Sequence, residues 1–200
     1  NPSTDKYTNQ NLSFTVASAT KPSISISNQS GTVQASKPTE SSVVRIASTG
    51  GSTAPYIWLK VPTQTGKTVT QVVDIATGTV LAPITYAGGV WFKLSDTGIA
   101  SGNSKDYRVD YTYSVCTASS ISVEAGWDCA GYPADPSNYA CSPVTANLPF
   151  TPILGAVQVQ TISQPATPLS GLCAPLNYEF SLNSAGGSNL KDVKFAITQI

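Results

Sequence analysis

Alternation of apolar and polar residues is the feature that most constrains what this chain can form. Between positions 107 and 115, every second residue is apolar: Tyr107, Val109, Tyr111, Tyr113 and Val115. In an extended strand these side chains share one face, whereas a helix, with its period of about 3.6 residues, would scatter them. The 14 Pro and 15 Gly residues leave no long window for a helix. The pattern therefore predicts an all-β fold.

Further runs rich in β-branched and aromatic residues are separated by Gly- and Ser-rich turns, such as the STGG of residues 48–51. They predict strands at residues 23–27, 42–47, 56–61, 68–75, 90–94, 107–115, 121–127, 157–162, 178–182 and 193–197. Short strands at this spacing are typical of antiparallel sandwiches. We expect tandem immunoglobulin-like antiparallel β-sandwich domains, with a long loop over residues 128–143, where alternation is absent.

An internal repeat is visible in the sequence. Residues 11–15 (NLSFT) resemble residues 147–151 (NLPFT), and residues 48–52 (STGGS) resemble residues 184–188 (SAGGS). Both matches have the same offset of 136 positions. Two separate matches at one offset indicate a repeated structural unit.

The repeat predicts the domain boundaries. Residues 24–26 match residues 157–159 at an offset of 133, so a small insertion lies between the matched segments. We expect residues 1–21 to be the tail of a preceding repeat and residues 22–153 to be one complete β-sandwich repeat. Residues 154–200 are expected to be the truncated start of the next repeat.

Charge and residue content argue against several classes of function. Lys and Arg number 11, Asp and Glu also number 11, and the net charge is zero, whereas nucleic-acid binding is expected to leave a basic patch. The chain has no His, which excludes Ser-His-Asp and Cys-His catalysis within it. No run of about 18 apolar residues is present, so we expect no membrane span. Because the chain begins at Asn1 without Met or a signal peptide, we expect a segment of a longer secreted protein.

The four cysteines are Cys116, Cys129, Cys141 and Cys173, and none of them forms a CxxC pair. An even number in a chain rich in Ser and Thr predicts disulfides and an oxidising compartment. At the repeat offset, Cys173 corresponds to Lys37 and Cys141 also corresponds to a residue other than Cys, which favours the pair Cys141–Cys173 and leaves Cys116–Cys129. A regular hairpin would place Cys129 roughly 30 Å from the turn, so that second pair requires a folded-back loop. The alternative is Cys129–Cys141 with Cys116–Cys173.

The acidic residues give little indication of chemistry. Asp106 and Asp110 share one strand face, but beside Arg108 we expect ion pairs rather than a glycosidase-like pair of carboxylates. Asp128 and Asp135 are oxygen ligands of the kind that calcium prefers, but the spacing of a calcium loop is absent. We therefore predict no enzyme activity, no catalytic residue, no cofactor and no metal.

Three tryptophans are candidates for a contact surface. Trp127 continues the alternation of residues 121–127, so we expect it in the core. Trp58 is out of phase with its apolar neighbours, which makes it, with Tyr56, the candidate for an exposed contact. The three tryptophans, Trp58, Trp91 and Trp127, could together form a platform on which a sugar stacks.

Three segments resemble a known family of repeats. Residues 106–116 (DYRVDYTYSVC), 124–133 (EAGWDCAGYP) and 172–180 (LCAPLNYEF) resemble repeats of very large Bacteroidota surface proteins. This family includes the gliding-motility adhesins that the type IX secretion system exports, and the resemblance spans most of residues 22–200. It implies an extracellular, cell-surface location associated with the outer membrane. The partners it implies are neighbouring repeats of the same chain, surface glycans, and outer-membrane secretion or motility proteins.

The function expected from this resemblance is mechanical. The chain would be a structural stalk segment of a secreted adhesin, mediating surface adhesion and gliding motility. The alternative is a carbohydrate- or protein-binding accessory module of a secreted enzyme, which an exposed Trp58 would favour. A capsid or tail-fibre domain is a third hypothesis, and it would require obligate trimers.

Overall fold

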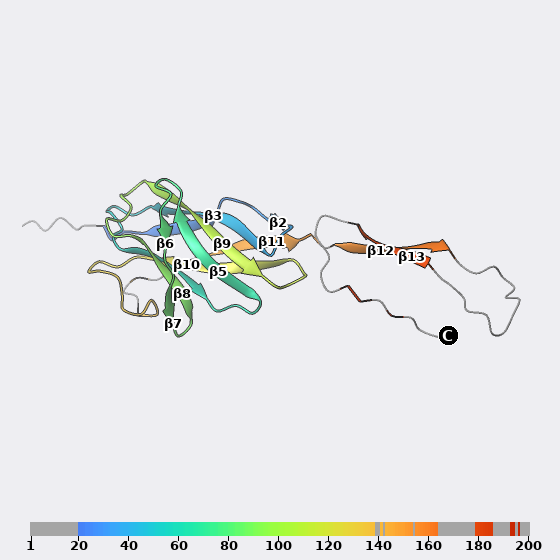
Figure 1. Ribbon diagram of the computed structural model, residues 1–200. Coiled ribbons are helices and arrows are strands. Elements are labelled where there is room, and N and C mark those ends of the chain that lie inside the picture. Colours follow the sequence, from blue (N-terminus) through green and yellow to red (C-terminus); the bar gives the residue numbers. More distant parts are fainter. Residues whose placement is uncertain are drawn as a thin grey trace, which may run out of the picture.

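The described part of the chain is built from strands alone. The computed structural model describes residues 20–138, 141, 143–153, 155–163, 179–185, 193, 194 and 196 of the 200 residues. Within these residues every regular element is a β-strand and none is a helix. The strands form two large sheets and a separate two-stranded sheet, which confirms the all-β prediction (Figure 1).

The first large sheet contains five strands in the order β1-β3-β9-β5-β6, with every neighbouring pair antiparallel. Its strands are β1 (Ile24–Asn28), β3 (Thr39–Ser48), β5 (Lys67–Asp74), β6 (Val80–Leu81) and β9 (Ser104–Tyr113). The central strand is β9, which pairs with β3 along one side and with β5 along the other.

The second large sheet contains six strands in the order β2-β11-β10-β4-β8-β7. Its strands are β2 (Val33–Ala35), β4 (Ile57–Pro62), β7 (Ile84–Tyr86), β8 (Gly89–Ser95), β10 (Ser119–Gly126) and β11 (Val144–Pro152). This sheet is mixed, because β2 runs parallel to β11 while the other neighbours are antiparallel.

The core lies between the two large sheets and is filled by alternate positions of their strands. On β9, Tyr107, Val109 and Tyr111 are completely buried, as the alternation predicts. Across the core, the rings of Tyr111 and Phe150 of β11 lie 5.7 Å apart between centroids. Burying one Val, Leu, Ile or Phe side chain stabilises a fold by about 1.5–3 kcal/mol. The shared core makes this unit a β-sandwich.

Most strands fall where the alternation predicts them, but β11 does not. No strand is predicted over residues 144–152, a segment in which Pro149 and Pro152 lack the N–H that a central strand donates. In the structure Pro149 lies opposite Ser120 of β10. On the other side of β11, the short β2 pairs only with residues 150–152. Pro149 is therefore tolerated where β11 has no second partner strand.

Two smaller differences concern short or partly described segments. β2, β6 and β7 have 3, 2 and 3 residues, too few for alternation to be recognised. The predicted strand at residues 193–197 lies partly outside the described residues, and the described residues 193, 194 and 196 are not in a strand. The predicted tail at residues 1–21 also lies outside the described residues, except for Thr20 and Lys21.

The two-stranded sheet follows β11 along the chain. It pairs β12 (Ala156–Ser163) with β13 (Glu179–Ala185) in antiparallel orientation (Figure 1). One of its faces exposes four apolar side chains: Val157, Val159, Phe180 and Leu182 are 42%, 61%, 38% and 43% exposed. A two-stranded ribbon with an uncovered apolar face is marginally stable in water on its own.

The buried Tyr107 gives a prediction about alkaline pH. Burial in the core, aided by the negative charge of Asp74, raises the pKa of the Tyr107 phenol well above its usual value. The unfolded chain therefore loses this proton first. The contribution of the protonated Tyr107 phenol to the free energy of unfolding is complete below about pH 10. Above that pH the free energy of unfolding falls by about 1.4 kcal/mol per pH unit for one such tyrosine.

We expect Tyr107→Phe to reduce that alkaline loss. The Tyr107 hydroxyl is buried without a hydrogen-bond partner, so its removal should leave stability at neutral pH unchanged or raise it. Urea unfolding of the parent and the variant at neutral pH and above pH 10 measures both effects. An alkaline slope that is identical in the two proteins would contradict the prediction.

Candidate functional site

The chain enters and leaves the sandwich at opposite ends (Figure 1). We call the end that contains residues 20–23 and 48–52 the leading end. We call the end that contains residues 35–38, 152, 153 and 155 the trailing end. β3 runs from the trailing to the leading end, and its 10 residues span about 33 Å at 3.3 Å each.

At the leading end, the turn after β3 clamps the incoming chain. The backbone N–H of Thr49 donates to the carbonyl of Ser23 at 2.8 Å, and Ser52 Oγ donates to the carbonyl of Thr20 at 2.8 Å. A Cβ on Gly50 would lie 2.7 Å from the carbonyl oxygen of Lys21, and one on Gly51 would overlap the Thr20 side chain. The close approach of the incoming chain therefore explains why two glycines stand in this turn.

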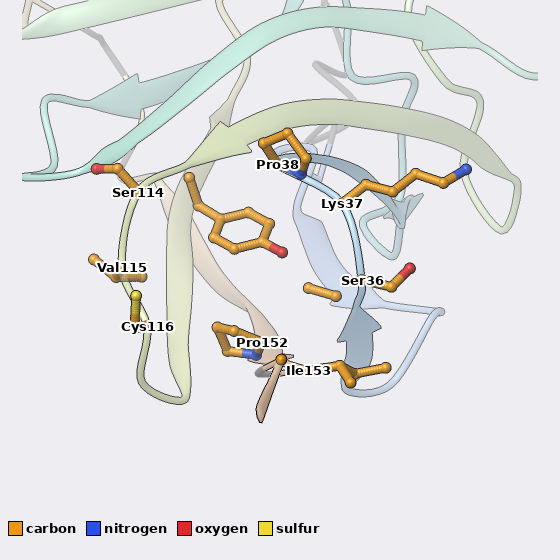
Figure 2. Close-up of a pocket in the computed structure, with 11 residues that line it drawn as sticks. Ser36, Lys37, Pro38, Ser114, Val115, Cys116, Pro152 and Ile153 are labelled. Carbon is orange, nitrogen blue, oxygen red and sulfur yellow. The ribbon is translucent and has the colours of Figure 1, made fainter. Parts of the chain in front are cut away.

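The trailing end contains an open cavity of about 360 Å³. Figure 2 shows residues 36–38 on one side, residues 114–116 on the opposite side, and Pro152 and Ile153 between them. The walls are mainly apolar, and the exposed Cys116 is one of the lining residues. The N–H of Ile153 donates to the carbonyl of Ala35 at 2.8 Å, so the last turn of the sandwich is tied to β2 next to this cavity.

The prediction that Trp58 is exposed is wrong, because its side chain is completely buried. Trp58 points to the outer face of the six-stranded sheet, opposite to the core residues Ile57 and Leu59. It lies opposite Gly126 of β10 in the strand register. Its indole occupies the space where a Cβ on Gly126 would be, so the missing side chain makes room for the ring.

The loop after β10 covers the neighbouring part of this outer face. The ring of Tyr132 lies 5.6 Å from that of Tyr56 and 6.0 Å from that of Trp91, measured between centroids. The ammonium group of Lys93 lies 5.1 Å from the Tyr132 ring centroid, within cation–π range. Trp91 is only 2% exposed. The predicted platform of Trp58, Trp91 and Trp127 is therefore wrong, because all three side chains are buried.

Tyr56 is half-buried and has an unusual backbone conformation. Its φ of 45° makes it the one non-glycine residue with positive φ among the described residues, a conformation that costs a non-glycine residue about 1–3 kcal/mol. Its ring packs against Tyr132 instead of facing solvent alone. Trp127, in contrast, is buried in the core as predicted.

The acidic residues take the structural roles expected of them. Asp106 forms an ion pair with Arg45 at 2.7 Å, and Asp110 forms one with Arg108 at 2.8 Å. The hydrogen bond from Arg45 lowers the pKa of the Asp106 carboxyl. Each carboxylate thus has its own guanidinium partner, as an exposed sheet face allows.

The two loop carboxylates Asp128 and Asp135 shape the loop itself. Asp128 accepts a hydrogen bond from the N–H of Ala130 at 3.2 Å, and Asp135 accepts one from the N–H of Ser137 at 2.8 Å. Both line a shallow cavity of about 390 Å³. Within the described part of the chain, no three His, Cys, Asp or Glu side chains gather as a metal site would require.

The predicted disulfides are absent among the described cysteines, since Cys116, Cys129 and Cys141 are all unpaired. The pair Cys116–Cys129 is wrong because β10 lies between the two residues. Its 8 residues separate them by about 26 Å, whereas bridged Cα atoms lie within about 7 Å. Cys173, the predicted partner of Cys141, lies outside the described residues.

No family profile and no curated protein matches this sequence. Within the described residues, the structure contains no helix with the length and apolar character needed to cross a bilayer.

The two clamp glycines give a prediction with a built-in control. Gly50→Ala and Gly51→Ala should each destabilise the sandwich by about 1–3 kcal/mol, because the added methyl group overlaps the incoming chain. Only the second should be rescued by Thr20→Gly, because Gly51 meets a side chain and Gly50 meets backbone atoms. Urea unfolding of the single and double variants measures the coupling. Rescue of both glycine variants, or of neither, would contradict this account.

Proposed function

We propose that this chain is a structural stalk segment of a large secreted cell-surface adhesin, built from tandem immunoglobulin-like sandwich repeats. In this proposal the protein lies outside the cell, associated with the outer membrane, and serves surface adhesion and gliding motility. Its immediate partners are neighbouring repeats of the same chain. Surface glycans or outer-membrane secretion and motility proteins would be contacted by the assembled adhesin.

The observation that carries the proposal is a repeated strand pairing. In the sandwich, Ile26 of β1 lies opposite Ile46 of β3. In the ribbon, Val159 of β12 lies opposite Leu182 of β13. Shifting positions 26 and 46 by the sequence offsets of 133 and 136 gives 159 and 182, so the two pairs occupy equivalent places. β12 and β13 therefore repeat the first strand pair of the sandwich in the same register.

The apolar positions of the two strand pairs support the same interpretation, that β12 and β13 correspond to β1 and β3. Val44 and Ile46 are completely buried beneath the six-stranded sheet. Their counterparts at the 136 offset, Phe180 and Leu182, form the exposed apolar face of the ribbon. That face is apolar in the same way as the core-facing side of a sandwich sheet. In the proposed array, the second sheet belongs to the same repeat as β12 and β13.

The strand order supports the immunoglobulin-like part of the proposal. Constant-type immunoglobulin sandwiches place strands A-B-E-D opposite C-F-G. The order β1-β3-β9-β5 opposite β4-β10-β11 follows that arrangement. There are two differences: the short β2 lies between the counterparts of strands A and B, and β6, β7 and β8 come between the counterparts of strands D and E.

The ends of the sandwich suit a chain that carries tension. A pull along a tandem array draws β1 and β2 towards the leading end and β11 towards the trailing end. Because β2 and β11 are parallel neighbours, opposite pulls slide them along each other. Their hydrogen bonds are then loaded together instead of opening one after another. The hydrogen bond from the N–H of Ile153 to the carbonyl of Ala35 lies next to the β2–β11 pair and would carry part of the same load. We call this set of hydrogen bonds the loaded patch.

The alternative of a binding module has less support. It depends on an exposed aromatic surface around Trp58 and Tyr56, but Trp58 is buried and Tyr56 packs against Tyr132. The cavity at the trailing end lies beside the connection to β12, where a neighbouring repeat would sit in the proposed array.

The stalk proposal can be tested on the native protein. Protease treatment of intact source cells should release peptides of this chain, because a surface stalk is exposed. An antibody against the chain should detect a parent protein many times longer than these 200 residues. A short parent protein found only in the culture medium would overturn the proposal and favour an accessory module.

The shear geometry gives a mechanical prediction. Ile153→Pro removes the N–H that donates to Ala35 and should cost about 0.5–1.5 kcal/mol of stability. Single-molecule pulling through both ends of the sandwich should then show unfolding at a lower force than in the parent. A matched control is Ala134→Pro in the exposed loop, which lies outside the loaded patch and should not lower the force. Equal unfolding forces for the parent and Ile153→Pro would contradict the prediction.

A further inference from the structure

Cys129 and Cys141 flank the neck of the loop that covers the outer face of the six-stranded sheet. β10 and β11 pair side by side, with Ala125 opposite Val144 at the leading end. Cys129 follows Ala125 by four positions, and Cys141 precedes Val144 by three. Both cysteines therefore leave the same end of one antiparallel strand pair, where two chains lie close together.

The surroundings of the two thiols differ. Cys141 is buried, with 5% of its surface exposed, whereas Cys129 is exposed. Burial raises the pKa of the Cys141 thiol, and the nearby groups acting on it are Lys21, Cys129 and Asp128. Cys129 is thus close enough to influence Cys141 electrostatically. Because Cys129 is exposed and Cys141 is buried, Cys129 is the thiol that an external reagent reaches first.

We propose that Cys129 and Cys141 form a site of reversible oxidation, in which a disulfide-bearing oxidant converts the two thiols into an intrachain disulfide that closes the loop. Cys129, as thiolate, attacks one sulfur of the oxidant, forms a mixed disulfide and releases the first thiol. Cys141 then loses its proton and attacks the sulfur of Cys129, releasing the second thiol. Two cysteine thiols are oxidised, and one disulfide of the oxidant is reduced to two thiols.

A disulfide between Cys129 and Cys141 would hold the loop after β10 against the outer face of the six-stranded sheet. The segment between the two cysteines carries Tyr132, which packs on Tyr56 and Trp91. A bridge at the neck restricts the loop in the unfolded chain and so favours the closed, covered form. This inference does not depend on the proposed stalk function, because it concerns one loop within one sandwich.

Chymotrypsin can separate the cysteines for a direct test, because it cleaves after aromatic residues. Cleavage after Trp127 and Tyr139 releases Cys129 on residues 128–139, since the Tyr132–Pro133 bond resists the protease, and leaves Cys141 on the peptide that begins at residue 140. Cys116 lies on another peptide, between Tyr113 and Trp127. The full chain is equilibrated with glutathione disulfide, its free thiols are blocked in acid, and the digest is analysed by mass spectrometry without reductant.

The expected product is a peptide pair linked through Cys129 and Cys141, which separates on reduction. Cys116→Ser should leave this pair unchanged, while Cys129→Ser and Cys141→Ser should each abolish it. The folded parent should form the pair faster than the chain unfolded in urea, because the native neck brings the thiols together. Failure of the pair to form, formation at equal rates in the two states, or linkage of Cys141 to another cysteine would overturn the proposal.

Discussion

The row of buried side chains on β9 fixes how the two sheets meet. β9 is the central strand of its sheet, and Tyr107, Val109 and Tyr111 all point from it into the core. Because side chains alternate along a strand, a slip of one residue would place Arg108 and Asp110 between the sheets. Taking this ion pair out of water would cost several kcal/mol per ion in desolvation, in addition to the apolar contacts that would be lost. The register of β3 and β5 against β9 follows from this constraint.

The same alternation explains what the sequence can and cannot predict. It locates the core of β9 and β10 because one face of each is apolar and the other polar. It fails at β4, where Trp58 lies on the outer face and is nevertheless buried. The rule equates the outer face with solvent, but here Gly126 leaves space for the indole and a distant loop covers its neighbours. Two signals of this cover are in the sequence: a glycine at the end of β10 and an aromatic residue, Tyr132, in the loop that follows.

The cysteines show a similar limit. The offset of 136 positions between the matched segments suggests which cysteines have no counterpart at the matched position. It gives no information about the distances between cysteines in the fold. Strand geometry argues against a bridge between Cys116 and Cys129, because a strand of 8 residues separates them, whereas Cys129 and Cys141 follow the same end of the paired strands β10 and β11. Predicting which cysteines can pair therefore requires knowledge of the strand order in the sheet. In this chain that order is difficult to predict, because β11 contains two prolines and is not recognised as a strand from the sequence.

The internal repeat is where sequence and structure support each other most closely. The two short sequence matches place the ribbon in line with the first strand pair, and the register of β12 and β13 agrees position by position. A ribbon of two strands cannot bury its own apolar face. In the sandwich, the equivalent face of β1 and β3 lies in the core between the two large sheets. In the proposed tandem array, the ribbon would be one part of a second sandwich, and its apolar face would be covered by the second sheet of that sandwich.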